Sequence, residues 1–221
     1  ESVIYELKDK QQRRKILTDL ENSLEGFVGS VKLVLRAGKQ GRLSGICGTV
    51  AQNISVEPQY AVAVETALGG AMQNIIVENE DAAKRCIGFL KEQRGGRATF
   101  LPITSVKGSE LRENGIENCE GYVARANEIV TFDPKFSGII ASLLGRIVIA
   151  EDINTATVIA KKYGYKFRIV TLDGQVINAG GSFTGGSAQK SGGMITRKNE
   201  LDTLASEITD LENKRDELRS N

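Results

Sequence analysis

The sequence predicts an α+β protein in which two weakly repeated α/β subdomains are flanked by N- and C-terminal coiled-coil helices. Three observations predict this fold: heptad-spaced apolar residues near both ends, a helix–strand order that occurs twice between them, and glycines gathered before the last helix. We expect four parts: coiled-coil helix 1–26, subdomain I 27–125, subdomain II 126–193 with the glycine motif, and coiled-coil helix 194–221.

The C-terminal segment has the spacing of a coiled-coil strand. Its apolar residues alternate in steps of three and four, with Arg215 at one seam position: Leu201, Leu204, Ile208, Leu211 and Leu218. Near the N-terminus, the same spacing follows a charged run at 6–15 that no core could bury: Leu17, Leu20, Leu24 and Phe27. The two helices can pair antiparallel, with the globular part at their tip. Alternatively, both are amphipathic helices packed on that globular part.

The composition is that of an ordinary globular protein, with 40% apolar and 26% charged residues in 221. No apolar run approaches the 18 or so residues of a membrane span, and the first residues do not resemble a signal peptide, so we expect a cytoplasmic protein without a membrane partner. The net charge of +1 requires any nucleic-acid contact to come from a local basic patch. Because the chain begins without methionine and stops within a helical pattern, we expect it to be a piece of a longer protein.

The residue types argue against most enzymes. The chain has no histidine, which excludes a histidine-based triad, a histidine general base and a mixed Cys/His zinc site. Its three cysteines, Cys47, Cys86 and Cys119, lack C-x-x-C spacing and fit buried thiols in a reducing compartment. No G-x-x-x-x-G-K-[ST] phosphate loop is present. We therefore expect no catalytic residue, metal site or cofactor in this chain.

The globular part contains the same order of elements twice. After an opening segment at 45–56, the first half predicts a helix at 58–68, a strand at 74–77, a helix from 79 or 81 to 90, and a strand at 97–101. The second half predicts a helix at 136–144, a strand at 146–150, a helix at 152–163 and a strand at 166–172. Asp173-Gly174 then predicts a hairpin that pairs the last strand antiparallel with 175–178.

Short stretches of the two halves also resemble each other in sequence. LGG at 68–70 corresponds to LLG at 143–145, IIVENEDA at 75–82 to IVIAEDIN at 147–154, and RATFL at 97–101 to RIVTL at 168–172. We interpret this as an internal repeat, with the boundary between its halves in the segment 104–129.

Residues 178–187, NAGGSFTGGS, form a glycine motif. It could cradle a phosphate through backbone N–H groups, although the lysine and spacing of known phosphate loops are missing. It could be a flexible linker, although Phe183 and Thr184 interrupt it and a strand precedes it. It could also be a surface that another backbone approaches closely, since glycine carries no side chain, and we favour this interpretation.

Several blocks resemble the hinge domain of structural maintenance of chromosomes (SMC) proteins, of the bacterial or archaeal condensin type. They span nearly the whole globular part: EGFVGSV at 25–31, YAVAVETALGG at 60–70, NIIVENEDAAK at 74–84, GGRATFLPI at 95–103 and FRIVTLDGQVINAGGSFTGGS at 167–187. The stretch 36–54 does not take part in the resemblance. The fold class that it implies is an SMC-hinge-like globule of two α/β subdomains.

The resemblance implies a homodimer in which each hinge joins another through two end surfaces around a small channel. The paired glycines of the family, which match Gly180, Gly181, Gly185 and Gly186, would contribute to that contact. ATP and Mg²⁺ would be bound only by head domains absent from this chain. Kleisin-type accessory subunits are expected on the full-length protein, which would be nucleoid-associated.

The resemblance also implies weak, non-specific DNA contact near the junction with the coils. The candidate basic residues are Lys161, Lys162, Lys166, Arg168, Lys190, Arg197 and Lys198. Alternatively, these are solvated side chains, several of which complement helix dipoles.

Our functional hypothesis is the homodimerisation hinge of an SMC chromosome condensation and segregation ATPase. Two rivals remain. One is a generic oligomerisation module at a coiled-coil tip without a DNA role, and the other is a small-ligand enzyme that uses the glycine motif. A zinc-hook tip is excluded because it needs a C-x-x-C motif.

Overall fold

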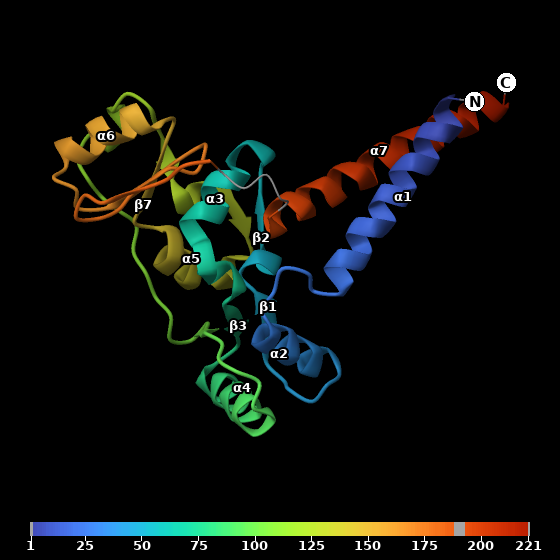
Figure 1. Ribbon diagram of the computed structural model, residues 1–221, viewed down its shortest axis with the longest axis horizontal. Coiled ribbons are helices and arrows are strands. Elements are labelled where there is room, and N and C mark those ends of the chain that lie inside the picture. Colours follow the sequence, from blue (N-terminus) through green and yellow to red (C-terminus); the bar gives the residue numbers. More distant parts are fainter. Residues whose placement is uncertain (1, 188–192, 221) are drawn as a thin grey trace. The chain divides into compact units, whose positions relative to one another are not determined.

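The computed structural model describes residues 2–187 and 193–220 (Figure 1). The chain divides into two compact units. The arm unit holds the residues up to 27 and from 192 onward, and the globular unit holds 28–191. These limits lie close to the predicted ends of the coiled-coil helices.

The arm unit consists of two long helices, α1 (Ser2–Asn22) and α7 (Met194–Ser220). Lys10 pairs with Glu207 at 2.8 Å and Arg13 with Glu200 at 2.8 Å, so residue numbers rise along one helix as they fall along the other. The helices therefore pair antiparallel, as the first of our two alternatives expects. Their buried seam is apolar and consists mainly of Leu7, Leu17, Ile195, Leu204 and Ile208.

Two details of the predicted seam were wrong. α1 ends at Asn22, and Leu24 takes a left-handed φ of 57°, so Leu24 and Phe27 do not continue the heptad. Gly26, with φ of 95°, follows in the same turn and carries the chain away from helical geometry. Conversely, Leu7 is buried inside the charged run that we expected to be wholly exposed.

The first sheet of the globular unit has the order β1-β3-β4, with β1 antiparallel and β4 parallel to β3. α4 connects β3 to β4, and α2 packs on α4. The bounds are α2 Gly29–Lys39, β1 Ile46–Thr49, β3 Ile75–Val77, α4 Glu80–Gln93 and β4 Phe100–Pro102.

The second sheet has the order β10-β9-β8-β7-β5, and only β7 and β8 are parallel. α6 connects β7 to β8, and its Ala156, Ile159 and Ala160 share a core cluster with Val148 and Ile169. The antiparallel β8–β9 pairing confirms the hairpin predicted from Asp173-Gly174. The bounds are β5 Tyr122–Arg125, β7 Ile147–Ala150, α6 Ile153–Lys162, β8 Arg168–Thr171, β9 Val176–Ile177 and β10 Phe183–Thr184.

The repeat is more extensive than the sequence comparison indicates. The remaining elements of the two halves are β2 (Ile54–Val56) with α3 (Ala61–Leu68) and β6 (Val130–Phe132) with α5 (Ser137–Leu144). β1 and β5 begin at residues 46 and 122, β2 and β6 at 54 and 130, and α3 and α5 at 61 and 137, a constant spacing of 76. Each half thus contains two strands, a helix, a strand, a helix and a strand in the same order.

The two halves are joined through equivalent strands. β2 pairs antiparallel with β6, with Ser55 opposite Thr131 at the centre and Ile54 opposite Phe132. Since Ser55 and Thr131 are also equivalent in the repeat, the internal two-fold axis passes between them. The segment 104–110 provides a second connection, because a Cβ on Gly108 would overlap the backbone nitrogen of Ser142 in α5.

Some element limits differ from the prediction. α2 was not predicted, although Val31, Val34 and Ala37 are buried at helical spacing. The strand expected at 97–101 is confined to β4. β5 lies in the sheet of the second half, although the predicted boundary placed 122–125 in subdomain I; pairing with β7 draws it there. Among the described residues, no helix is long and apolar enough to cross a membrane.

Candidate functional site

The glycine motif follows β9 and contains β10, the outermost strand of the second sheet. Both residues of β10 are exposed, and Phe183 keeps 53% of its surface in solvent. Asn178 N–H donates to Ser182 O at 2.8 Å, and Phe183 lies opposite Ile177. Because backbone groups alternate in direction along an antiparallel ladder, the N–H and C=O of Phe183 point away from β9. β10 therefore presents an open edge with an exposed aromatic side chain.

Three of the four predicted glycines have left-handed backbones. Gly180 has φ of 92° and Gly186 has φ of 141°, and a Cβ on either would meet no atom of the described residues within 4 Å. Gly181 has φ of 100°, and a Cβ there would lie 3.5 Å from the ring of Tyr165. These conformations favour glycine, and Gly180 and Gly186 leave their surroundings open.

Gly185 is different, because its own chain fills the space beside it. The Gln175 side chain forms two hydrogen bonds with the backbone of Gly186: Nε2 donates to the carbonyl at 2.9 Å, and Oε1 accepts from the N–H at 2.8 Å. We call this pair of bonds the Gln175 clamp. A Cβ on Gly185 would overlap Oε1 of Gln175. The sequence alone did not single out Gln175. The signal that could have found it is its position across a hairpin from the paired glycines.

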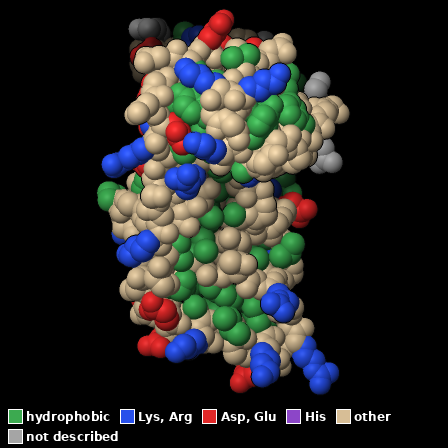
Figure 2. Space-filling view, turned by 90° about the vertical axis from the view of Figure 1, so that its left-hand side faces the viewer, with side chains coloured by type: hydrophobic (Ala, Val, Ile, Leu, Met, Phe, Trp, Pro, Cys, Tyr) green, Lys and Arg blue, Asp and Glu red, His purple; other side chains and the backbone are tan. Residues whose placement is uncertain are grey.

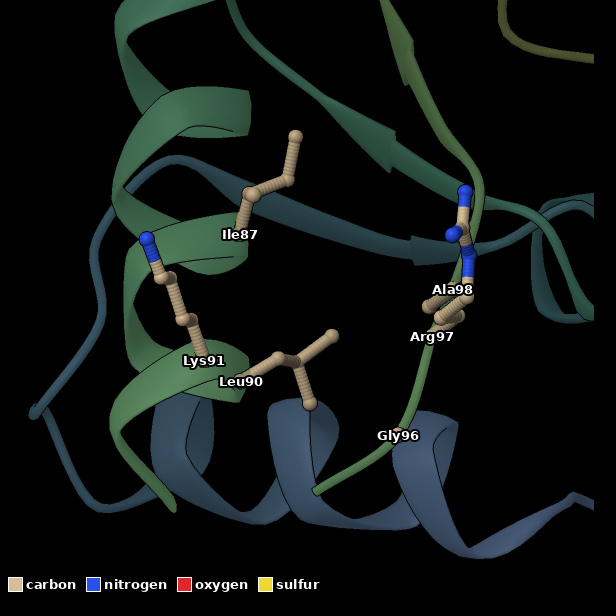
Figure 3. Close-up of a pocket in the computed structure, with 6 residues that line it drawn as sticks. All are labelled: Ile87, Leu90, Lys91, Gly96, Arg97 and Ala98. Carbon is tan, nitrogen blue, oxygen red and sulfur yellow. The ribbon is translucent and has the colours of Figure 1, made fainter. Parts of the chain in front are cut away.

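A hollow lies at the outer edge of the first sheet, beside the segment that leads into β4. It has a volume of about 410 Å³ and is lined by Ile87, Leu90, Lys91, Gly96, Arg97 and Ala98. In Figure 3, Ile87 and Leu90 point from α4 toward the 96–98 segment. Ile87 is 55% exposed, whereas Leu90 is buried and forms the floor.

Figure 2 views the face at the left of Figure 1. Apolar side chains gather near the middle of its lower half, on the side of the globular unit where α4 lies, and charged side chains of both signs stand along the margins. This face therefore combines apolar surface with a border of mixed charge.

The basic candidates of the globular unit differ in accessibility. Lys161 and Lys162, in the last turn of α6, and Lys166, just beyond it, are exposed. Lys162 Nζ also lies 5.6 Å from the ring centroid of Tyr163. Arg168 is half-buried and donates from Nη1 to the Ala67 carbonyl at 3.0 Å. Arg168 thus connects α3 of the first half to β8 of the second, so its head is engaged inside the protein.

The basic candidates of the arm unit are similarly divided. Arg197 is 8% exposed; its Nε pairs with Glu21 at 2.7 Å and its Nη2 donates to the Glu25 carbonyl at 2.9 Å. Arg197 is therefore part of the contact between α1 and α7. Lys198 is half-buried and also engaged, and Lys190 lies outside the described residues.

The cysteines are free thiols. Cys86 is buried, and desolvation raises its pKa. Cys47 and Cys119 are half-buried, and desolvation also raises the pKa of Cys47. In the part of the chain that the structure describes, no cluster of His, Cys, Asp or Glu could hold a metal ion.

A comparison with protein families matches residues 43–160 to the SMC proteins flexible hinge domain. The chain belongs to this family of SMC flexible hinge domains. The match ends before β8, so the glycine motif lies outside it.

Among curated proteins, the chain is similar to the chromosome partition protein Smc of Halothermothrix orenii, with 39% identity over 93% of this chain and 17% of that protein. It is also similar to the chromosome partition protein Smc of Bacillus subtilis, with 36% identity over 97% of this chain and 18% of that protein. The chain thus spans less than a fifth of the length of these relatives.

Two solved structures extend the comparison. An asymmetric dimer of the Geobacillus stearothermophilus SMC hinge domain has a TM-score of 0.91 and 36% identity, covering 99% of this chain and 89% of that chain. The Pyrococcus furiosus SMC hinge domain has a TM-score of 0.62 and 28% identity, covering 87% of this chain and 93% of that chain. The fold expected from the resemblance is confirmed.

Proposed function

We propose that this chain is the homodimerisation hinge of an Smc-type chromosome partition protein and joins the coiled-coil arms of two copies. The observation that carries the proposal is the open edge of β10, bordered by glycines that leave space for another backbone. An unpaired strand edge is a template for pairing with a second chain. The similarity to a hinge domain crystallised as a dimer supports the same assignment.

Another open strand edge, at β4 of the first sheet, defines how two copies would pair. Among the strands that the structure describes, β4 has one neighbour, β3, and its other side is open for pairing in the first sheet. When β10 of one copy pairs with β4 of the other, a two-fold axis repeats the contact at the opposite end. Two identical contacts then hold the dimer, in keeping with the two end surfaces implied by the family.

Solution mass tests this proposal. Light scattering over a dilution series should give twice the chain mass for the wild type. A variant with bulky residues at Gly180, Gly181, Gly185 and Gly186 should give a folded monomer, as should Gly185→Glu alone, because the new side chain would displace Gln175 and leave a charge unpaired at the contact. A wild-type monomer at every concentration would remove the hinge assignment and leave a coiled-coil tip without a joining role. An unchanged dimer mass in Gly185→Glu would sink the interface assignment.

A weak, non-specific DNA contact is a second part of the proposal. The exposed Lys161, Lys162 and Lys166 at the end of α6 form the basic cluster that favours it. Arg168 and Arg197 are not included, because Arg168 is half-buried, Arg197 is buried, and both heads are engaged within the chain.

DNA binding can be measured with a fluorescent duplex at low and high salt. Three phosphate contacts predict that replacing the three lysines by alanine lowers the slope of log affinity against log salt by about 3. A control variant removes three other exposed lysines, Lys39, Lys84 and Lys107, and should change the slope less. Equal effects of both variants, or no binding at low salt, would leave a dimerisation module without this DNA site.

The remaining assignments concern the whole protein. We propose that ATP hydrolysis and Mg²⁺ binding occur in head domains outside this chain, that kleisin-type subunits bind elsewhere, and that the protein is cytoplasmic and nucleoid-associated. The curated relatives are more than five times longer than the matched region, which leaves room for such domains.

A further inference from the structure

We propose that Phe183 of one copy inserts into the hollow beside β4 of the second copy and acts as the main anchor of the dimer. This inference rests on the proposed homodimer and names the side-chain contact that holds it. It joins two features that residues 2–187 and 193–220 leave uncovered: an exposed aromatic ring on one sheet edge and an apolar hollow on another.

The hollow has the chemistry of an aromatic site. Ile87, Leu90 and Ala98 provide apolar walls and floor, and Lys91 and Arg97 supply two cations at the margin. A phenyl ring gains from apolar burial, and its face attracts a cation within about 6 Å of the ring centroid. A carboxylate or an amide would leave the apolar walls without a suitable partner. An aromatic side chain satisfies both parts of the lining.

The position of the hollow favours the ring that β10 carries. The 96–98 segment runs directly into β4, so a strand paired with β4 passes beside the hollow within a few residues. Phe183 lies on the open strand β10, and it is the one aromatic residue among the strongly exposed apolar side chains described in the globular unit. Strand pairing and ring insertion are therefore compatible within one contact.

The occupant must come from another molecule. β10 pairs with β9, which packs against α6. In Figure 1, α4, the helix that carries Ile87, Leu90 and Lys91 of the hollow, lies at the opposite end of the globular unit from α6. Phe183 cannot reach the hollow of its own chain, and a second copy supplies the same ring in the reciprocal position. Each dimer then contains two inserted rings.

The first test compares two truncations of exposed apolar side chains. Phe183→Ala should weaken the dimer roughly 100- to 1,000-fold, because a central aromatic anchor is lost twice per dimer. Val158→Ala is the matched control, since Val158 is 67% exposed on α6 and lies outside both edges; its dimer Kd should stay within about twofold of wild type. Sedimentation over a dilution series measures both values.

The second test distinguishes an inserted ring from a general effect on β10. Ile87→Trp should fill the hollow and weaken the dimer, and the double variant Ile87→Trp/Phe183→Ala should recover part of the loss, because the new indole occupies the space left by the missing ring. Ile87 is half-exposed, so the monomer should keep its melting temperature.

The outcomes separate this inference from the proposal on which it rests. A wild-type monomer would overturn both. If the wild type is a dimer and Phe183→Ala has the same dimer Kd, the anchor alone is overturned. The anchor is also overturned if the Kd of the double variant rises by the product of the two single-variant effects.

Discussion

The Gln175 clamp predicts that even an alanine at Gly185 weakens the dimer. An alanine at 185 would place its Cβ on Oε1 of Gln175, so the amide must leave and both hydrogen bonds to Gly186 are lost. Each such bond contributes roughly 0.5–1.5 kcal/mol net, and since the site is partly exposed we take about 1–2 kcal/mol for the pair. A chain without the clamp must reorder this segment when it pairs, so two copies per dimer cost up to about 2–4 kcal/mol, or up to about a 30- to 1,000-fold weaker dimer.

The assay is the dimer Kd of Gly185→Ala, Gln175→Ala and the double variant, measured by sedimentation over a dilution series. Gln175→Ala removes the clamp and the obstacle together, so the double variant should be no weaker than Gln175→Ala alone. Gly29→Ala is the control, because its Cβ would meet no atom of the part of the chain that the structure describes within 4 Å, and its backbone is not left-handed.

Two results would refute this reasoning. A wild-type Kd for Gly185→Ala would mean that the clamp does not support the interface. If the double variant dimerises more than tenfold more weakly than Gln175→Ala, the Cβ of residue 185 meets the partner chain rather than Gln175. Gly185 would then be a site where the partner's backbone approaches closely.

Four further predictions concern single residues. Asn79→Ala removes the side chain that accepts from the first turn of α4 and should cost about 1 kcal/mol of unfolding free energy in urea titrations; an unchanged midpoint would count against the cap. Hydrogen bonds from Thr155 lower the pKa of Asp152 in the folded protein, so the ionised carboxylate stabilises the fold at pH values above the pKa that Asp152 has in the unfolded chain. The difference in unfolding free energy between wild type and Asp152→Asn should therefore close as pH falls below about 3.9, and a difference that stays constant with pH would contradict this. Arg197→Ala should speed amide hydrogen exchange in α1 and α7, because it removes bonds that hold the two helices together. Its DNA affinity should stay within about twofold of wild type, and a large loss of affinity would return Arg197 to the DNA candidates. Gly108→Ala should cost about 1–3 kcal/mol because its Cβ overlaps α5, whereas Gly70→Ala, with open space around it, should be neutral; equal effects would argue against the connector packing on α5.

Local patterns predicted much of the fold. The strand before and the helix after each cap, at Asn79 and Asp152, were predictable because apolar runs and capping residues act over a few positions. The pairing of β2 with β6 was not predictable, because each strand has only three residues and their pairing is set by contact between the two halves. The end of α1 was also misplaced, because Leu24 keeps the heptad spacing although its backbone turns left-handed.

The candidate site was predictable in outline. The glycines marked the segment that contains the open edge, and glycine tolerates the left-handed backbones at Gly180, Gly181 and Gly186. Their part in a dimer contact stays a prediction. The basic candidates were not resolved by residue type alone: Arg168 and Lys166 are two positions apart, but only Arg168 reaches an internal carbonyl. Partner choice of this kind depends on the tertiary packing of distant elements such as α3 and β8.

The order of the chain determines how tension on the arms is carried through the globular unit. Only nine residues separate β10 from α7, so a pull on α7 loads the Gln175 clamp and then the two-residue ladder of β10 with β9. A pull on α1 arrives instead at Val28, whose N–H is held by Gln73 Oε1 at 2.8 Å, and at α2. The two arms therefore load different halves, and the proposed joining strand is the first part of the second sheet to carry force.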